Sequence, residues 1–294
     1  MNLLNSYGFN NEGSIFMAAN RVIENCKIVL YGVPYDGTTS FRPGARFGPS
    51  AIREVSNGIE TFCPELEIDL EDLNFADIGS LKVNYGDPKP VIDQVEKVTY
   101  QLINAGKKPL MLGGEHSITI GAVKASADHF NNLIVIQLDA HADLREEWLG
   151  SMYSHACTMR RCLDFLPNKK IFQIGIRSGT RNEFREMKEY NRLIHYGKNQ
   201  PAQYLANALI NYKDNPIYLT IDLDWFDPSV MPGTGTPEPG GYFWNDFSQI
   251  INILKEYKII GADVVELAPQ LDNSGISSIL AAKVVRSLLM LLSK

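Results

Sequence analysis

Short apolar stretches recur along the chain and alternate with longer stretches whose apolar residues repeat every three to four positions. The short stretches are rich in Ile, Val and Leu, as expected for strands that are buried on both faces of a sheet. The predicted strands cover residues 27–34, 109–114, 133–141, 171–177, 217–224 and 259–267. The clearest predicted helices cover residues 49–62, 89–106, 202–213 and 244–258.

Strands that alternate with helices along one chain form a mainly parallel sheet with helices on its faces. We therefore expect an α/β protein with three αβα layers around a mainly parallel central sheet, folded as a single domain over residues 1–294. Two Gly/Pro-rich segments, residues 37–50 and 227–241, are predicted to be long loops. Such loops often shape an active-site rim, although for residues 37–50 a connecting role is favoured over substrate contact.

Ionisable residues follow one predicted strand in strict alternation. The segment LDAHADL places Asp139, His141 and Asp143 two positions apart. In extended backbone these side chains share one face, because the strand repeat is two residues. Acids held together in this way are unfavourable unless a cation lies among them, and a divalent metal is the simplest one. Taken alone, the triplet is equally compatible with a solvated loop whose acids pair with Arg145.

Other predicted strands also end in polar residues. His116 follows the strand at 109–114, and Asp222 and Asp224 end the strand at 217–224. Glu266 interrupts the last apolar strand near its end. These side chains should meet, because open α/β sheets place their chemistry at the carboxyl ends of the strands. Hydrogen bonding explains any one buried acid, but these segments lack the cations needed to pair with all of them.

The metal-binding candidates are four aspartates and two histidines, with no cysteine. This oxygen-rich set suits Mn²⁺ better than a structural Zn²⁺. Six side chains are too many for one ion that keeps a catalytic water, so we expect two ions that share ligands and activate a water between them. Four aspartates balance two divalent ions and Glu266 adds negative charge, so a small cationic substrate is expected rather than a phosphoester.

Bulk properties narrow the function further. The net charge of −6 and the pI near 5.5 argue against nucleic acid as a partner, because phosphate binding requires a concentrated basic face. The four cysteines show no C-x-x-C spacing, which favours reduced thiols in a cytoplasmic protein. The apolar run at 277–292 contains Lys283 and Arg286 and is shorter than the ~20 residues that span a bilayer. We therefore expect a terminal core helix and no membrane association.

Three segments resemble the signature segments of the ureohydrolases, the arginase and agmatinase family. They are LGGEHSITIG (112–121), VIQLDAHADLR (135–145) and LTIDLDWFDPSVMPGTGTPEPGG (219–241). The similarity extends to residues 32–54, 153–161 and 261–269, and so covers nearly the whole chain. The resemblance implies an arginase-like fold and hydrolysis of a guanidino compound at a binuclear manganese centre. Family members are commonly trimers or hexamers, so a homo-oligomer is expected.

Carried over by position, the resemblance implies a role for each candidate residue. One Mn²⁺ would be bound by His116, Asp139, Asp143 and Asp222, and the other by Asp139, His141, Asp222 and Asp224. Ni²⁺ or Co²⁺ are alternatives. Glu266 would bind the guanidinium nitrogens, and His155, in the segment YSHA, matches the family's proton-shuttle histidine at the substrate. Without the resemblance, His155 would be interpreted as an ordinary loop histidine.

The segment LREEWLG, followed by YSHA, is similar to the agmatinase branch, which predicts hydrolysis of agmatine to putrescine and urea. Thr180 stands where arginase relatives carry an acid, and Glu147 is a candidate for binding the ammonium tail. Trp225 and Phe226 replace smaller residues and are expected to narrow the pocket near the second ion. The alternative substrates are guanidine, guanidinobutyrate, guanidinoacetate and arginine.

Two further alternatives belong to other functional classes. A single-zinc deacetylase of similar architecture is disfavoured, because the sequence has no His–His pair. A non-catalytic regulatory subunit of the same fold should have lost ligands, yet all six are present.

Overall fold

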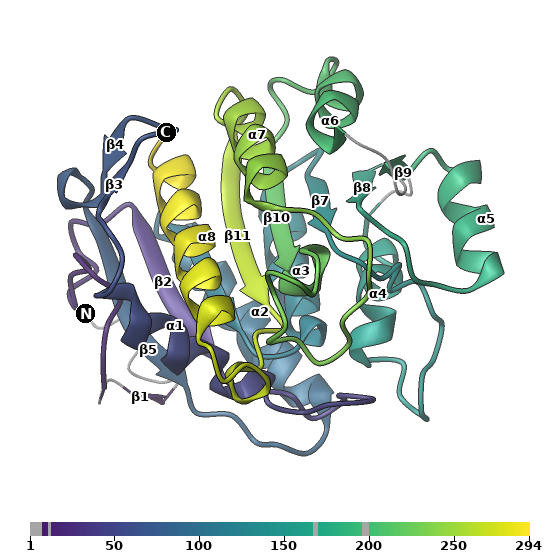
Figure 1. The fold of residues 1–294 in the computed structure, drawn as a ribbon, viewed down its shortest axis with the longest axis horizontal. Helices are drawn as coiled ribbons and strands as arrows, with labels where there is room; N and C mark the ends of the chain where they lie inside the picture. Colours follow the sequence, from purple (N-terminus) through teal and green to yellow (C-terminus); the bar gives the residue numbers. More distant parts are fainter. Residues whose placement is uncertain (1–7, 11–12, 167–169, 196–199) are drawn as a thin grey trace.

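The computed structural model describes residues 8–10, 13–166, 170–195 and 200–294. A nine-stranded sheet runs through this part of the chain (Figure 1), in the order β1-β5-β2-β6-β11-β10-β7-β8-β9. All neighbours pair in parallel except β1, which is antiparallel to β5. The strands are β1 (Phe9–Asn10), β2 (Ile28–Val33), β5 (Phe75–Leu81), β6 (Lys108–Gly113), β7 (Ile134–Leu138), β8 (Ile171–Ile174), β9 (Leu193–His195), β10 (Ile217–Asp222) and β11 (Ile259–Val265). A separate hairpin joins β3 (Phe62–Cys63) and β4 (Ile68–Asp69).

The predicted strands are all present, as β2, β6, β7, β8, β10 and β11. The sequence pattern missed β5, whose segment FADIGSL carries an acid and a glycine among its apolar residues. In the fold the Asp77 carboxylate is buried and accepts two hydrogen bonds from the Arg53 guanidinium, at 2.7 and 2.8 Å. A buried acid is tolerated in a strand when such a partner is available, and this partner lies 24 residues away in the sequence.

Helices cover both faces of the sheet. They are α1 (Gly48–Ser56), α2 (Pro88–Asn104), α3 (Thr119–His129), α4 (Thr158–Leu163), α5 (Arg181–Glu189), α6 (Pro201–Leu209), α7 (Trp244–Leu254) and α8 (Ile276–Ser293). One apolar core lies between the sheet and α1, α6, α7 and α8, and a second lies between the sheet and α2, α3, α4 and α5. The predicted three-layer αβα architecture is therefore confirmed (Figure 1).

The C-terminal helix α8 is apolar because it is a core helix. Its 18 residues have a mean hydropathy of 1.7, which by length and composition would suit a membrane span. However, 72% of this window is buried inside the protein, against β2, β6 and β11 among other elements. The predicted terminal helix packed on the core is confirmed.

The two-residue repeat of β10 separates the two layers of the protein. Ile217, Leu219 and Ile221 pack into the core formed with α8, whereas Tyr218 packs into the core formed with α2. Asp222 has the same parity as Tyr218 and therefore belongs to the second face. The sheet thus delivers its polar strand ends toward the side covered by α2 and α3.

Candidate active site

The predicted polar residues meet at the carboxyl edge of β6, β11, β10 and β7, which are consecutive neighbours in the sheet. His116 begins the short 3-10 helix η3 (His116–Ile118) after β6, and Asp139 directly follows β7. Asp222 is the last residue of β10, and Asp224 lies in η6 (Leu223–Trp225). These four side chains are almost completely buried.

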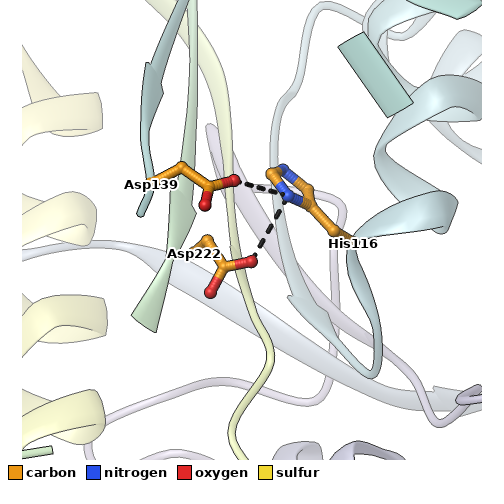
Figure 2. Close-up of side chains that lie close together, drawn as sticks. All are labelled: His116, Asp139 and Asp222. Carbon is orange, nitrogen blue, oxygen red and sulfur yellow. Dashed lines mark ion pairs between the residues drawn. The ribbon is translucent and has the colours of Figure 1, made fainter. Parts of the chain in front are cut away.

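His116 lies among three carboxylates. Its Nδ1 atom is 3.0 Å from an oxygen of Asp139, 3.0 Å from one of Asp143 and 3.4 Å from one of Asp222. Figure 2 shows how Asp139 and Asp222, from two different strand ends, both point toward this nitrogen. Nδ1 is buried and has no hydrogen-bond partner of acceptable geometry among the described residues.

His141 forms a second group beside the first. Its Nδ1 atom is 2.9 Å from an Asp224 oxygen and 3.6 Å from an Asp139 oxygen. Donor atoms of Asp139, His141 and Asp224 lie within 4.8 Å of one another, and the same holds for His116, Asp139 and Asp222. Asp139 therefore belongs to both groups, as expected of a carboxylate between two ions. The His141 side chain is 25% exposed, so the second group is the more open one.

A row of buried polar residues crosses the sheet just before the ligand candidates, on the N-terminal side of the strand ends. Asp263, Thr220, Gln137 and Gln173 are paired side by side across β11, β10, β7 and β8, and all are completely buried. The Gln173 amide donates to Gln137 Oε1 at 2.7 Å, and the Gln137 amide donates to Asp139 at 2.7 Å. The row thus fixes the orientation of the shared carboxylate.

The same row determines the tautomer of His116. Thr220 Oγ1 donates to Asp263 Oδ1 at 2.6 Å and lies 2.9 Å from His116 Nε2. The Thr220 hydroxyl donates its hydrogen to Asp263, so toward His116 its oxygen can only accept a hydrogen bond. The imidazole Nε2 therefore carries a hydrogen. The Nδ1 lone pair is then free to bind a cation, an arrangement typical of metal-binding histidines.

The charges of the cluster require compensation. Burial, followed by repulsion from Asp224 and Asp139, raises the pKa of Asp222 well above its ordinary value. Burial and Asp139 raise the pKa of Asp143 to about 7. Burial alone would lower the pKa of His116, but the surrounding carboxylates outweigh it and raise that pKa well above the usual range. Protons or divalent cations can supply the missing positive charge, and metal binding displaces such protons. The unpartnered Nδ1 and the oxygen-rich donor set fit a pair of divalent cations.

Glu266 lies directly beside the cluster. It follows β11 and is nearly buried, and its Oε1 accepts a hydrogen bond from the His116 backbone N–H at 2.7 Å. Its φ of 69° is left-handed, which is rare for a non-glycine residue and is found mainly where the surroundings enforce it. Burial, followed by repulsion from Glu115, raises the pKa of Glu266 well above its ordinary value. A cationic partner would stabilise this carboxylate.

His155 borders the site from a loop. It begins the 3-10 helix η4 (His155–Cys157) and lines a cavity of about 220 Å³ together with His141 and Asp143. Burial, followed by the His141 imidazole, lowers the pKa of His155 to about 4, so its ring is neutral at pH 7. Its ring nitrogens face the hydroxyls of Thr38 and Ser40, at 3.3 and 3.2 Å.

The chain matches the model of the arginase family over residues 26–291. The chain belongs to this family. It is 37% identical over 281 residues to the agmatinase of Bacillus anthracis, with 95% of this chain and 96% of the relative covered. It is 38% identical over 248 residues to the N(1)-aminopropylagmatine ureohydrolase of Thermococcus kodakarensis, with 83% and 84% covered. The structure of the agmatine ureohydrolase of Thermoplasma volcanium matches with a TM-score of 0.84 and 33% identity, covering 95% of this chain and 94% of that chain.

These similarities confirm the predicted family and show that this ureohydrolase is most like the agmatinases. The arginase-like fold is confirmed by the same findings. The two histidine–aspartate groups of this family member are the place where a binuclear metal centre would be held.

Two sequence-based interpretations change with the structure of this ureohydrolase. Trp225 and Phe226 do not narrow the pocket: both are buried in the core under α7, where Trp225 stacks on Tyr242 with ring centroids 4.6 Å apart. Glu147 is exposed and is not among the described residues that line the cavity, so its role as the tail-binding acid stays a prediction.

The sequence interpretation also missed an acid and a cation of this family member. Glu238 Oε1 lies 2.8 Å from Ser178 Oγ and 3.8 Å from His141 Nε2, behind the open metal group. Arg177 donates to the backbone carbonyls of Asp224 and Glu238, at 2.7 and 2.8 Å, and so joins a ligand candidate to its loop. Glu238 lies in a segment that carries the family resemblance and Arg177 ends a predicted strand, but only the fold shows what the two residues contact.

Proposed function

We propose that this protein hydrolyses a guanidino compound, with agmatine as the preferred substrate and putrescine and urea as the products. The observation that carries this proposal is the pair of histidine–aspartate groups that share Asp139, next to the buried carboxylate of Glu266. We further propose two Mn²⁺ ions as the native cofactor, because the donors are hard oxygens and imidazoles without any thiolate.

When bound, two divalent ions would neutralise the aspartates and lower the pKa of a water for attack on the guanidinium carbon. His116, Asp139, Asp143 and Asp222 would hold one ion, and Asp139, His141, Asp222 and Asp224 the other. Asp139 can serve both because its two oxygens face the two histidines, Oδ2 toward His116 and Oδ1 toward His141.

Glu266 orients the substrate. A carboxylate binds a planar guanidinium through two parallel hydrogen bonds, and burial strengthens both. The strained backbone of Glu266 and the hydrogen bond from His116 N–H hold the carboxylate in one place. The substrate cation supplies the charge that this raised-pKa carboxyl group lacks.

His155 moves a proton. Hydrolysis forms a C–O bond, breaks a C–N bond and requires a proton on the departing amine. The His155 imidazole is neutral at pH 7 and lines the cavity. It can therefore accept a proton from the oxygen that originates in the attacking water and donate it to the nitrogen of the departing amine.

Agmatine is preferred because the relatives at 37% identity are agmatinases and because the site carries an excess of carboxylates. One observation favours a second candidate, guanidinobutyrate, whose tail is a carboxylate. Arg145 lines the cavity with its guanidinium 4.1 Å from the Trp148 ring centroid, and among the described residues it forms no ion pair with an acid. A carboxylate tail would pair with Arg145, whereas the agmatine ammonium would be repelled by it.

Urea release across a panel of guanidino compounds tests the proposal. Purified protein loaded with Mn²⁺, Ni²⁺ or Co²⁺ is supplied with agmatine, guanidinobutyrate, guanidinoacetate, guanidine and arginine, and bound metal is counted in parallel. We expect two ions per chain and the highest kcat/KM with agmatine and Mn²⁺. Urea from guanidinobutyrate but not from agmatine would reject agmatine, and no urea from any compound would reject the function itself.

A further inference from the structure

A loop at residues 36–46 crosses the rim of the site and is attached to other segments by its side chains. Arg42 donates to the backbone carbonyls of Thr234 and Gly235, at 2.7 and 3.2 Å. Thr38 reaches inward to Glu115, the residue before His116. The loop is therefore more than the connection that the sequence favoured, because it links His155 to the interior.

The hydrogen bonds of Glu115 have one consistent direction when its carboxyl group is ionised. Glu115 is completely buried, and its carboxylate receives the Thr38 backbone N–H at 2.7 Å and the Thr38 hydroxyl at 2.6 Å. The Ser117 hydroxyl donates to the same carboxylate at 2.5 Å. Burial raises the pKa of the Glu115 carboxyl group to about 7. In its ionised form the group has no hydrogen to give, so both hydroxyls are then donors toward it.

The direction at Glu115 dictates the direction at His155. Because the Thr38 hydroxyl proton points at Glu115, only its oxygen lone pairs remain for other partners. One of them accepts the His155 backbone N–H at 3.0 Å. The other faces His155 Nδ1 at 3.3 Å, and that contact is a hydrogen bond only if Nδ1 carries the hydrogen.

The opposite ring nitrogen is then the basic one. In a neutral imidazole with a hydrogen on Nδ1, the lone pair lies on Nε2. Nε2 is 3.2 Å from the Ser40 hydroxyl, and Ser40 and His155 line the cavity together with the metal-ligand candidate His141. The nitrogen that can accept a proton is thus the one on the cavity side of Ser40.

We propose that Glu115, acting through the Thr38 hydroxyl, is a positioning residue that holds His155 in the tautomer whose Nε2 accepts the proton during turnover. This inference rests on the proposed function, because it assigns the working atom of the proposed proton-transfer residue. The Glu115 carboxylate contacts Thr38 and Ser117 and not the His155 ring, so its effect on the ring passes through the Thr38 hydroxyl.

A rival explanation is that Glu115 and Thr38 only anchor the loop. The two explanations separate at Thr38, because its backbone N–H anchors the loop while its hydroxyl orients the ring. Thr38→Val keeps the shape and the backbone hydrogen bond but removes the hydroxyl. Thr38→Ser restores the hydroxyl. Ser117→Ala is the matched control, because it removes the other hydroxyl that donates to Glu115 Oε1 and has no contact with His155.

The experiment compares kcat and KM for agmatine in the metal-loaded wild type, these three variants, His155→Asn and the double variant Thr38→Val/His155→Asn. We expect His155→Asn to lower kcat by about 100-fold, within the usual range for general acid–base groups. Thr38→Val should lower kcat about 10-fold with unchanged KM, while Thr38→Ser and Ser117→Ala stay within about twofold of wild type. The double variant should be no slower than His155→Asn, because residues that act through one another are not additive.

Two results would overturn the inference. One is a double variant whose loss is the product of the two single losses, since that would give Thr38 a role independent of His155. The other is wild-type kcat in Thr38→Val. Thermal unfolding and manganese content, measured on every variant, exclude misfolding or metal loss as the source of a low kcat. Wild-type protein without activity toward any guanidino compound would instead defeat the proposed function, so the two failures are distinguishable.

Discussion

Two histidines of this ureohydrolase are each held by a threonine and a buried carboxylate, but these supports come from very different parts of the fold. His116 is backed by Thr220 and Asp263, and His155 is backed by Thr38 and Glu115. In each case a buried carboxylate accepts a hydrogen bond from the threonine hydroxyl, and the threonine oxygen in turn accepts a hydrogen bond from the imidazole N–H. The result in both is one ring nitrogen without a hydrogen, Nδ1 in His116 and Nε2 in His155.

The supports differ in their origin. Thr220 and Asp263 are direct partners in the β10–β11 register, so the hydrogen bonding of the sheet itself places them together. Thr38 lies in the 36–46 loop and meets Glu115 across 77 residues of sequence, with no regular element to align them. A rigid support suits a residue that must hold a cation, whereas a loop-borne support suits a residue that exchanges protons at the cavity. The difference teaches that the residues supporting the metal-binding candidate His116 stand on paired strands, whereas the hydroxyl supporting the proton-transfer candidate His155 comes from a loop.

Loss of His116 should separate the two halves most sharply. His116→Asn removes the only imidazole of the buried group, and metal coordination contributes several kcal/mol to such reactions, which corresponds to a loss of at least about 10³-fold in kcat. Elemental analysis should show fewer than two bound ions per chain. His155→Asn is the control and should keep both ions while it loses turnover. Equal metal content in the two variants would contradict the division.

The difference in pH-dependent stability between wild type and His155→Asn should report on the His155 half alone. The pKa of His155 is lowered to about 4 in the folded chain from an ordinary value of 6.5. The unfolded chain therefore binds the extra proton between these values, and the stability contributed by the neutral ring is present above pH 6.5 and is lost as the pH falls toward 4. The lowered pKa corresponds to roughly 3 kcal/mol in total, most of which is lost between pH 7 and pH 4.5. Denaturant unfolding of wild type and His155→Asn at pH 7 and pH 4.5 measures it, and an unchanged difference between the two proteins would contradict the assignment.

Asp263 should matter for metal affinity and not for the proton-transfer half. Asp263→Asn keeps the shape but weakens the acceptor of the Thr220 hydroxyl, and outer-shell changes of this kind lower metal affinity by about 10–100-fold. Competition with a fluorescent chelator measures the affinity. Thr119→Val, which removes a more distant donor to Asp263, serves as the milder comparison. An unaltered affinity in Asp263→Asn would remove the parallel between the two supports.

The smallest effects should distinguish two acids at the rim. Glu238 lies 3.8 Å from His141 Nε2, whereas Glu147 is exposed and outside the cavity lining. Glu238→Gln should weaken the open metal group or raise the KM for agmatine about fivefold, in line with the modest strength of half-exposed charge pairs. Glu147→Gln should change KM less than twofold. A larger effect at Glu147 would restore it as the tail-binding acid.

The sequence was sufficient for the sheet and for the ligand candidates on it. Parallel strand order brings the carboxyl ends of the strands to one edge. His116, Asp139 and Asp222 follow from that rule and meet in the fold. The two-residue repeat itself ends with the strands, because Asp143 has a left-handed φ of 53° and Asp224 lies in η6 and not in β10. The polar row also had a signal, because Gln137 and Thr220 each stand two positions before a ligand candidate.

The contacts of loops were beyond such rules. Nothing in GTTSF places Thr38 beside Glu115, because loop geometry depends on side-chain anchors far away in the sequence, such as Arg42 on Thr234. The misjudged Trp225 shows the same limit. It directly follows a ligand candidate, yet the turn of η6 sends its ring into the core, where it stacks on Tyr242.

The strand synthesised last within the sheet, β11, is inserted at its middle, between β6 and β10. Before β11 emerges from the ribosome, the chain can form only two unconnected half-sheets, β1-β5-β2-β6 and β10-β7-β8-β9. His116 leaves one half and the aspartates leave the other. A chain without β11 can still bring together Asp139, His141 and Asp224, which all follow β7 and β10, but it lacks the strand that places His116 beside them. The complete cluster can therefore assemble only after β11 has been synthesised and has paired with β6 and β10.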